Sequence, residues 1–207
     1  MKTKDRIIHT ALHLFNEEGE PNVTTNHIAD EMDISPGNLY YHFRSKDDII
    51  WQIFLNYEKK IQQVLEQKNV NYTSMEDMWR YLQSVFKIIS EYRFLYRNLI
   101  QLMSRIEFLK RHFRHILALK SQTALNIMTA LAEDGLLNAD TQTVASLADQ
   151  IALTATFWLN YSIAIYDDNY DEEKKLSHGI FHVMRMVAPF LTENDKAILD
   201  ELSAQFL

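Results

Sequence analysis

A short polar stretch near the N-terminus holds the side chains that are best suited to binding. The hydroxyls of Thr24 and Thr25, like the N–H groups at the start of a helix, suit the oxygens of phosphate groups. Asn38 can make two hydrogen bonds to adenine in the major groove of DNA. Tyr41 and His42 add a donor and a ring that can stack. Each of these side chains has a physical reason to contact a nucleic acid.

The same stretch is predicted to form two short helices joined by a tight turn. Thr24 and Ser35 are good N-cap residues, and Pro36 fits the first helical position, where its missing N–H costs nothing. Asp33 and Ile34 break the pattern between them. The apolar positions at helical spacing are Ile28, Ala29 and Met32 in the first helix and Leu39, Tyr40 and Phe43 in the second. Core packing is the alternative interpretation of Tyr40, and for Leu39 and Phe43 it is the expected one.

Over about residues 5–55 the chain resembles the helix-turn-helix of the TetR/AcrR family of bacterial transcriptional regulators. The residues that carry the resemblance are Thr24-Thr25, Ile28-Ala29, Ile34-Ser35, the run from Gly37 to Phe43, and Lys46-Asp47. Asp33 stands where the family often has Gly, and Asp tolerates a positive φ better than most residues. The DNA-contacting positions that the resemblance implies are Thr24, Thr25, Ser35, Pro36, Gly37, Asn38, Tyr40, Tyr41, His42 and Lys46.

Composition favours long helices with few breaks. Of the 207 residues 47% are hydrophobic and 24% charged, and only four are Gly and three are Pro, which disfavours a many-turned β fold. The absence of cysteine excludes disulfides and thiolate metal sites. The N-terminus lacks the apolar core of a signal peptide. The apolar run Ile151–Tyr166 is shorter than a membrane span of ~20 residues, so we expect a cytoplasmic protein with no membrane partner.

The net charge of −7 does not argue against DNA, because the local field decides. The basic residues near the predicted DNA-binding helices are Lys2, Lys4, Arg6, Arg44 and Lys46. Further along, nine basic residues between Arg80 and Lys120 face only Glu91 and Glu107. This basic belt is interpreted either as a solvated surface or as a site for an anionic effector such as a carboxylate or an acyl coenzyme A.

The periodicity predicts an all-α fold of nine or ten helices with no strand and no internal repeat. The resemblance implies an N-terminal three-helix DNA-binding domain at residues 1–46 and a larger effector-binding and dimerisation domain at 47–207. A helix at about 46–66 links the two, and the polar connection 67–73 is the best domain boundary. The remaining helices are predicted at 3–18, 74–89, 105–132, 141–166, 172–191 and 192–206, with an aromatic-rich segment at 92–103 and a polar break at 167–171. Pro189 is predicted to interrupt the helix over 172–191 near its end.

The second domain holds most of the aromatic residues, which can line an apolar pocket or form an ordinary core. We predict a small, partly apolar effector, with Arg111 and Arg114 holding a charged end and the tail directed toward Trp158. The candidate ligand-binding residues are Trp79, Phe86, Tyr96, Met103, Arg111, Phe113, Arg114, Trp158 and Tyr161. An effector that shifts the linking helix would change the separation of the two recognition helices in a dimer.

A homodimer interface is predicted on helices 141–166 and 172–191, where small residues would permit close helix approach. These small residues are Ala145, Ala148, Ala152, Ala155, Gly179 and Ala188. Packing within one subunit is the alternative interpretation.

Catalytic and metal sites are not indicated. The histidine pairs at 9 and 13, 112 and 115, and 178 and 182 lack the Glu of HExxH, and neither GxSxG nor a phosphate-binding Gly loop occurs. We therefore predict no enzyme activity, no cofactor and no metal. The alternative function is a helix-turn-helix regulator controlled through protein partners without a small ligand.

Overall fold

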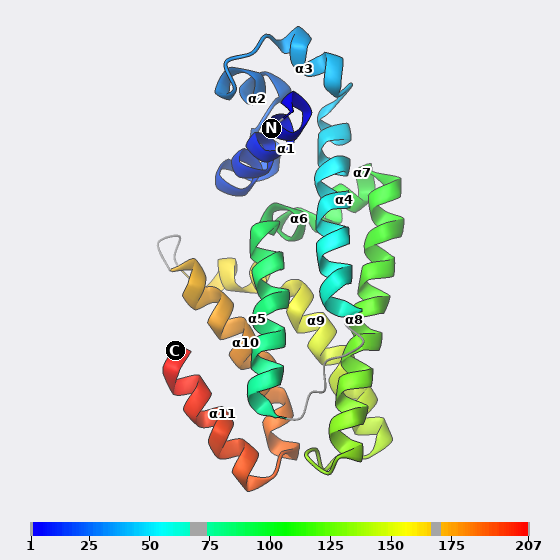
Figure 1. Cartoon of the computed structure of the whole chain (residues 1–207), viewed down its shortest axis with the longest axis vertical. Helices are drawn as coiled ribbons and strands as arrows, with labels where there is room; N and C mark the ends of the chain where they lie inside the picture. Colours follow the sequence, from blue (N-terminus) through cyan, green and yellow to red (C-terminus); the bar gives the residue numbers. More distant parts are fainter. Residues whose placement is uncertain (1, 67–73, 167–170, 207) are drawn as a thin grey trace. The chain divides into compact units, whose positions relative to one another are not determined.

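The computed structural model describes residues 2–66, 74–166 and 171–206, where all regular elements are helices (Figure 1). The all-α prediction is confirmed. The predicted boundary at 67–73 and most of the predicted break at 167–171 lie outside the described residues. The helices are α1 (Thr3–Leu14), α2 (Thr25–Glu31), α3 (Pro36–His42), α4 (Lys46–Leu65), α5 (Met75–Glu91), α6 (Arg93–Arg97), α7 (Leu99–Arg105), α8 (Glu107–Glu133), α9 (Thr141–Ile165), α10 (Glu172–Val187) and α11 (Glu193–Phe206).

Two compact units make up the chain. The first consists of residues 1–60 and 92–113, and the second of residues 61–91 and 114–207, so that α4 and α8 contribute to both. The predicted domains divide the chain differently, at residue 46, because they follow the expected roles of the segments rather than their packing. That division stays a prediction.

In the first unit, α1, α2 and α3 are grouped beside the first turns of α4 (Figure 1). Gly19, with φ of 83°, ends the helical run that starts with α1, as its sequence position predicts. The buried Asn16 then ties this run to α6, since its side-chain oxygen accepts from the Phe94 N–H at 3.1 Å and its carbonyl accepts from Arg97 at 3.2 Å. The short helix α6 therefore holds the end of the α1 segment in place.

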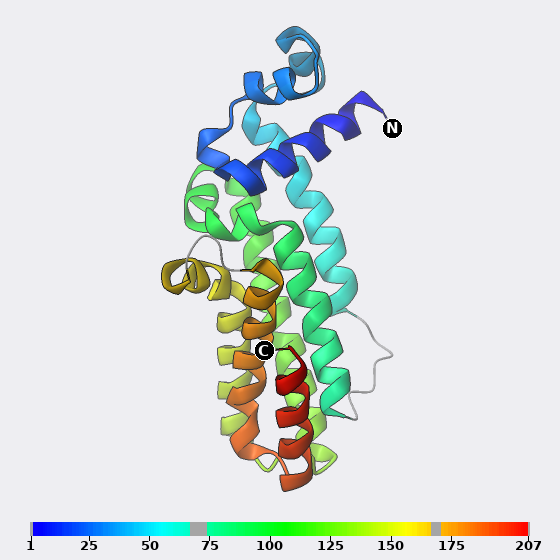
Figure 2. The same cartoon turned by 90° about the vertical axis from the view of Figure 1, so that its left-hand side faces the viewer.

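In the second unit, α10 lies beside α9 and α5, and α11 packs on α5 (Figure 2). Asp140 and Asp171 cap α9 and α10, accepting the Thr143 N–H at 2.7 Å and the Glu173 N–H at 2.8 Å. Helix α5 buries one apolar stripe against its neighbours, and that stripe consists of Met75, Met78, Trp79, Leu82, Val85, Phe86 and Ile89. The apolar residues of α5 recur with the helical period of 3.6 residues, and this spacing places them on the face that enters the core.

The interruption that Pro189 predicts near the end of the helix over 172–191 is confirmed, and the aromatic segment 92–103 shows a division that was not predicted. Helix α10 ends at Val187, and Ala188–Phe190 forms a 3₁₀ turn that carries Pro189, which lacks the N–H needed to continue an α-helix. The aromatic segment divides at Asn98 into α6 and α7.

Gly179 shows that the small residues of α9 and α10 serve packing inside the subunit. A Cβ at this position would lie 2.4 Å from Phe86 Cε1 and 2.6 Å from Trp158 Cδ1, so α10 approaches Trp158 as closely as it does only because residue 179 is Gly. Trp158 in turn donates its Nε1 hydrogen to the Lys175 carbonyl at 2.7 Å. The prediction that these small residues form the dimer interface is corrected, because most of them are buried in the core. The buried ones are Ala148, Ala152, Ala155, Gly179 and Ala188.

Candidate functional site

The helix-turn-helix has the local geometry that its sequence predicts. Thr24 Oγ1 accepts the His27 N–H at 3.1 Å and starts α2, while Ser35 Oγ accepts the Asn38 N–H at 3.2 Å and starts α3. Asp33 adopts φ of 53° in the turn between them, which is the left-handed conformation expected at this position. An Asp therefore occupies a turn position whose positive φ a Gly would adopt at a lower conformational cost.

Helix α3 divides into a buried and an exposed face. Leu39 and Phe43 are buried, as predicted, and they fix the helix on the unit. Tyr41 is 85% exposed, and Asn38 and Gly37 also lie on the surface. Nothing but Ser35 Oγ, at 3.9 Å, lies within 4 Å of a Cβ built on Gly37. The outer face of α3 therefore presents an amide, a phenol and bare backbone to an incoming surface.

Tyr40 is not a core residue. Its side chain is 48% exposed and its hydroxyl lies 2.9 Å from Thr25 Oγ1. This bond joins the start of α2 to α3 and so helps to hold the two helices together. Both hydroxyls remain near the surface. His42, half-buried, packs edge-on against Tyr41 with ring centroids 5.1 Å apart.

Lys46 makes contacts inside the first unit that the sequence does not predict. Its ammonium donates to the carbonyls of Glu20 and Val23 at 2.9 and 3.0 Å and lies 2.9 Å from the Glu20 carboxylate. These three acceptors match the three N–H bonds of an ammonium. Lys46 therefore holds the start of α4, a role that the residue's sequence position alone does not reveal, and its predicted DNA contact stays a prediction.

The Glu20 carboxylate is the buried centre of a charge cluster, which we call the Glu20 clamp and define by Glu20, Lys46, Asp47 and Arg105. Glu20 is 1% exposed, and its Oε1 also accepts from Arg105 Nη2 at 2.9 Å. Arg105 Nε lies 2.9 Å from Asp47 Oδ1. Burial lowers the pKa of Arg105, but the two carboxylates outweigh it and raise the pKa above its ordinary value. The clamp joins the helix-turn-helix, α4 and α7.

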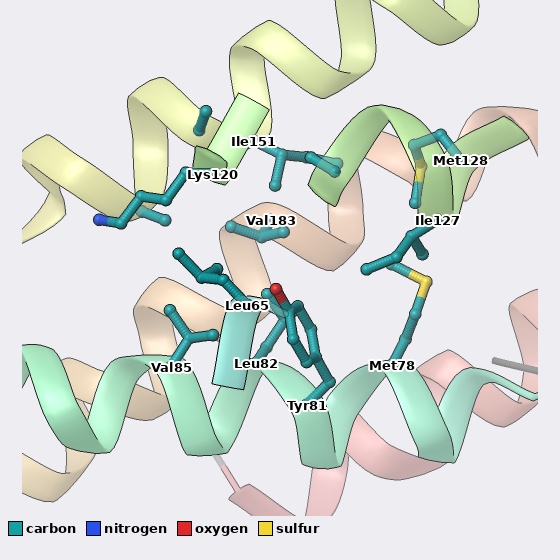
Figure 3. A pocket seen from close by; sticks show the side chains of 13 residues that line it. Leu65, Met78, Tyr81, Leu82, Val85, Lys120, Ile127, Met128, Ile151 and Val183 are labelled. Carbon is teal, nitrogen blue, oxygen red and sulfur yellow. The ribbon is translucent and has the colours of Figure 1, made fainter. Parts of the chain in front are cut away.

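A cavity of about 40 Å³ lies inside the second unit. Its walls come from α4, α5, α8, α9 and α10 and are aliphatic apart from Lys120 and Tyr81. The residues that line it (Figure 3) are Leu65, Met78, Tyr81, Leu82, Val85, Lys120, Ala124, Ile127, Met128, Ile151, Ala152, Ala155 and Val183. None of the nine predicted ligand-binding residues lines this cavity, and their role in binding a ligand stays a prediction.

The predicted ligand-binding residues are spread over both units. Tyr96, Met103, Arg111 and Phe113 belong to the first unit, and Trp79, Phe86, Arg114, Trp158 and Tyr161 belong to the second. The aromatic members mainly serve the core. Tyr96, for example, shares a buried hydrogen bond with Tyr57, and burial raises the pKa of both phenols. Arg111 and Arg114 are exposed.

An apolar surface runs along α9. Leu153 is 60% exposed, Phe157 39% and Tyr161 56%, and together with His182 and Met186 of α10 they line a shallow groove. We call this surface the α9 face. The helices are those predicted for dimerisation, although the residues are the large ones rather than the small ones.

Two further properties bear on partners. No helix in the described ranges is long and apolar enough to cross a membrane. The described residues also bring together no group of three or more His, Asp or Glu side chains suited to a metal ion. Two histidines of the predicted pairs have other contacts instead, His112 with Glu58 at 2.9 Å and His178 with the Tyr166 hydroxyl at 2.8 Å.

Known protein families match this chain in two consecutive parts. A family model described as "Bacterial regulatory proteins, tetR family" matches residues 7–53, and one described as "Bacterial transcriptional repressor" matches residues 56–199. A crystal structure of a TetR-family transcriptional regulator from Marinobacter aquaeolei VT8 is 34% identical, with a TM-score of 0.89, and the match covers 100% of this chain and 99% of that chain.

Curated relatives are similar over a shorter range. The HTH-type transcriptional regulator QacR of Staphylococcus aureus is 29% identical over 114 residues, which cover 55% of this chain and 57% of that protein. The IcaR negative regulator of the biofilm operon of Staphylococcus epidermidis is 31% identical over 114 residues, covering 54% and 60%. The chain thus spans a little over half the length of these relatives. With matches to both family models and full-length likeness to a solved member, the chain belongs to the tetR family of bacterial regulatory proteins.

Proposed function

We propose that the protein is a dimeric transcriptional repressor that binds operator DNA and is released by a small, partly apolar effector. The family assignment supports DNA binding. The observation that carries the proposal is the exposed face of α3, where Gly37, Asn38 and Tyr41 are open to solvent while Leu39 and Phe43 fix the helix from behind. An exposed α-helix fits the major groove of DNA. In this proposal residues 1–46 are the DNA-binding domain.

Helix α4 is the proposed route from effector to DNA. Its first residue, Lys46, belongs to the Glu20 clamp, and its last, Leu65, lines the cavity of the second unit. The Leu65 carbonyl also accepts from Thr123 Oγ1 at 3.1 Å, which holds this end of α4 on α8. A ligand that displaces Leu65 acts on the same helix that positions the helix-turn-helix, so it can change the spacing of two recognition helices.

The direct experiment is selection of bound sequences from random DNA, followed by measurement of binding to the selected site by fluorescence anisotropy. A two-fold symmetric site with half-sites about one helical turn or a multiple apart is the expected result. Selection that returns no preferred sequence, from protein that is folded and dimeric, would contradict the proposal.

Removal of the Asn38 amide is expected to relax the sequence preference. Asn38→Ala should cost roughly 1–3 kcal/mol of binding free energy per half-site if the amide makes a bidentate base contact. The loss should be confined to one base position in each half-site. Gln83→Ala, which removes an exposed amide from α5, is the control and should bind unchanged. Equal affinity of Asn38→Ala for all sites would remove Asn38 from the readout.

A charge on the α9 face is expected to separate the proposed dimer. Phe157→Glu would place a carboxylate in an apolar contact, where it would have to be desolvated without a partner. The variant should sediment as a monomer at concentrations where the unmodified protein is a dimer, with the helix content unchanged. Phe108→Glu, at a 60% exposed Phe on α8, is the control and should stay dimeric. A dimeric Phe157→Glu protein would place the interface elsewhere.

A further inference from the structure

Two lysines lie close to the end of α3, and their ammonium groups have different surroundings. Lys46 donates to the carbonyls of Glu20 and Val23 and lies beside the Glu20 carboxylate. Lys4, in the first turn of α1, instead places its Nζ over the ring of Phe43, 5.5 Å from the ring centroid. An aromatic ring attracts a cation to its face but carries no net charge of its own. The positive charge of Lys4 is therefore held beside α3 without being neutralised by that contact.

The helices α1 and α3 together fix the position of Lys4. Ile7 and Ile8 follow one turn later on the same side of α1, and Ile7 is fully buried. The Lys4 side chain consequently leaves α1 at the edge of its inner face. Phe43, which ends α3, is itself buried, so its ring is a firm support. Lys4 as a whole is exposed, and its ammonium can meet a group that arrives from solvent.

The position of Phe43 brings Lys4 to the surface that carries the proposed DNA-reading side chains. Phe43 stands two residues after Tyr41, whose side chain is 85% exposed on the outer face of α3. Because the Lys4 ammonium lies on the Phe43 ring, it stands beside the C-terminal end of the same helix. DNA whose major groove holds α3 therefore brings its phosphate backbone close to this end of the helix.

The acidic residues that are near in sequence leave Lys4 as the best-placed cation. Asp5 is the next residue on α1, and adjacent residues of a helix point to different sides. Asp47 is paired with Arg105 at 2.9 Å in the Glu20 clamp. Arg44, which follows Phe43, is also exposed, but the Asp48 carboxylate accepts its backbone N–H at 3.1 Å and offsets its charge.

We propose that Lys4 binds a phosphate of the DNA backbone beside the major groove that α3 occupies. The inference rests on the proposed function and adds to it a residue outside the helix-turn-helix. An ammonium has three N–H donors, and its hydrogen bonds to a phosphate are charge-assisted. A contact of this kind positions the protein on DNA and reads no base.

The contact would fix how α3 lies in the groove. The Phe43 ring connects Lys4 to α3, so the ammonium and the outer face of α3 belong to one rigid edge of the first unit. A dimer on two half-sites would make the contact twice. Its loss should weaken binding to every DNA sequence by the same factor, because the phosphate backbone is the same in all of them.

The test is the salt dependence of binding to the selected site, measured by fluorescence anisotropy with the full chain. Each phosphate contact adds about 0.9 to the slope of log K against log salt concentration. Lys4→Met removes the charge from both subunits, so it should flatten the slope by about 2 and lower the affinity roughly tenfold or more at about 0.1 M salt. Selection from random DNA should return the same preferred sequence. An unchanged slope in Lys4→Met would overturn the inference.

Two further variants show whether the position of the charge matters. Lys59→Met removes an exposed lysine of α4 that lies about 20 Å along the helix from Lys46, and it should keep the slope of the unmodified protein. Lys4→Arg keeps the charge and should keep the slope as well. Equal flattening by Lys59→Met and Lys4→Met would contradict the inference, because it would reflect net charge rather than a contact. Melting followed by circular dichroism checks that each variant is folded.

The same data distinguish failure of this inference from failure of the proposed function. Specific binding with an unchanged slope in Lys4→Met would leave the repressor proposal in place and remove Lys4 from the interface. Binding without any preferred sequence, but with a slope that Lys4→Met flattens, would support the phosphate contact and contradict an operator-specific repressor. A folded protein that binds no DNA would contradict both.

Discussion

The Glu20→Gln variant should melt roughly 5–10 °C below the unmodified protein, a large effect for a one-atom change. Glu20 is 1% exposed and accepts hydrogen bonds from Lys46 and Arg105, each at 2.9 Å. An amide in its place leaves two cations around a group without charge. Removing one partner of a buried ion pair costs about 3–5 kcal/mol. We expect the low end of that range, because Lys46 and Arg105 are 24% and 41% exposed.

The matched control is Glu17→Gln, which removes a carboxylate from the same segment. Glu17 pairs with Arg93 but is 55% exposed, so its change should cost less than about 1 kcal/mol. Melting followed by circular dichroism compares the two. If the Glu20 clamp positions the helix-turn-helix, Glu20→Gln should also weaken binding to the selected DNA site well below its own melting range. Equal effects of the two substitutions would show that the clamp is an ordinary surface network.

Local features of the helix-turn-helix could be predicted from sequence because they are decided within a few residues. The caps at Thr24 and Ser35 and the positive φ at Asp33 depend only on nearby backbone and side chains. The buried positions of Leu39 and Phe43 follow from helical spacing. The role of Lys46 could not be predicted in this way, since its partner Glu20 lies 26 residues earlier in the chain and meets it only in the folded unit.

The ligand site was harder to predict because aromatic residues mark a core as well as a pocket. Phe86 and Trp158 pack closely against Gly179, and Trp79 is buried in the same core cluster. The cavity is bounded instead by aliphatic residues of several helices, whose proximity depends on the tertiary fold. One signal was present in the sequence. Lys120 interrupts an apolar stripe of α8 at helical spacing, and that stripe is Phe113, Ile116, Ala124, Ile127 and Leu131.

Most of the small residues that the dimer prediction selected are buried inside the subunit. Small residues do permit close approach, but on α9 and α10 they admit neighbouring helices of the same subunit, as at Ala152 and Gly179. Sequence cannot distinguish an internal from an external partner for such a stripe. Exposure can, and the large residues of α9 that are exposed, Leu153, Phe157 and Tyr161, are the ones on which the proposed dimer rests.

Replacing Lys120 by Met is expected to stabilise the protein, and most strongly at low pH. The folded-state pKa is about 7 and the ordinary value 10.5. Between these values the unfolded chain binds more protons than the folded one, so the free energy of unfolding of the unmodified protein rises with pH. Below pH 7 both states are protonated and the full penalty applies. From pH 6 to pH 9 the unmodified protein should gain roughly 2–3 kcal/mol relative to Lys120→Met.

Urea unfolding at pH 6 and pH 9, followed by circular dichroism, gives the difference in unfolding free energy between the two proteins at each pH. The change in this difference from pH 6 to pH 9 reports on residue 120, because the other titrating groups contribute equally to both proteins. Lys87→Met should show no such dependence, because its amine is exposed in both states. A Lys120→Met protein that is less stable than the unmodified one at pH 6 would mean that the ammonium is well paired in the fold. A Lys120→Met protein that is more stable at pH 6 would mean that the Lys120 side chain lowers the stability of the unliganded protein. Stability is then not the reason for an amine at this point of the cavity wall.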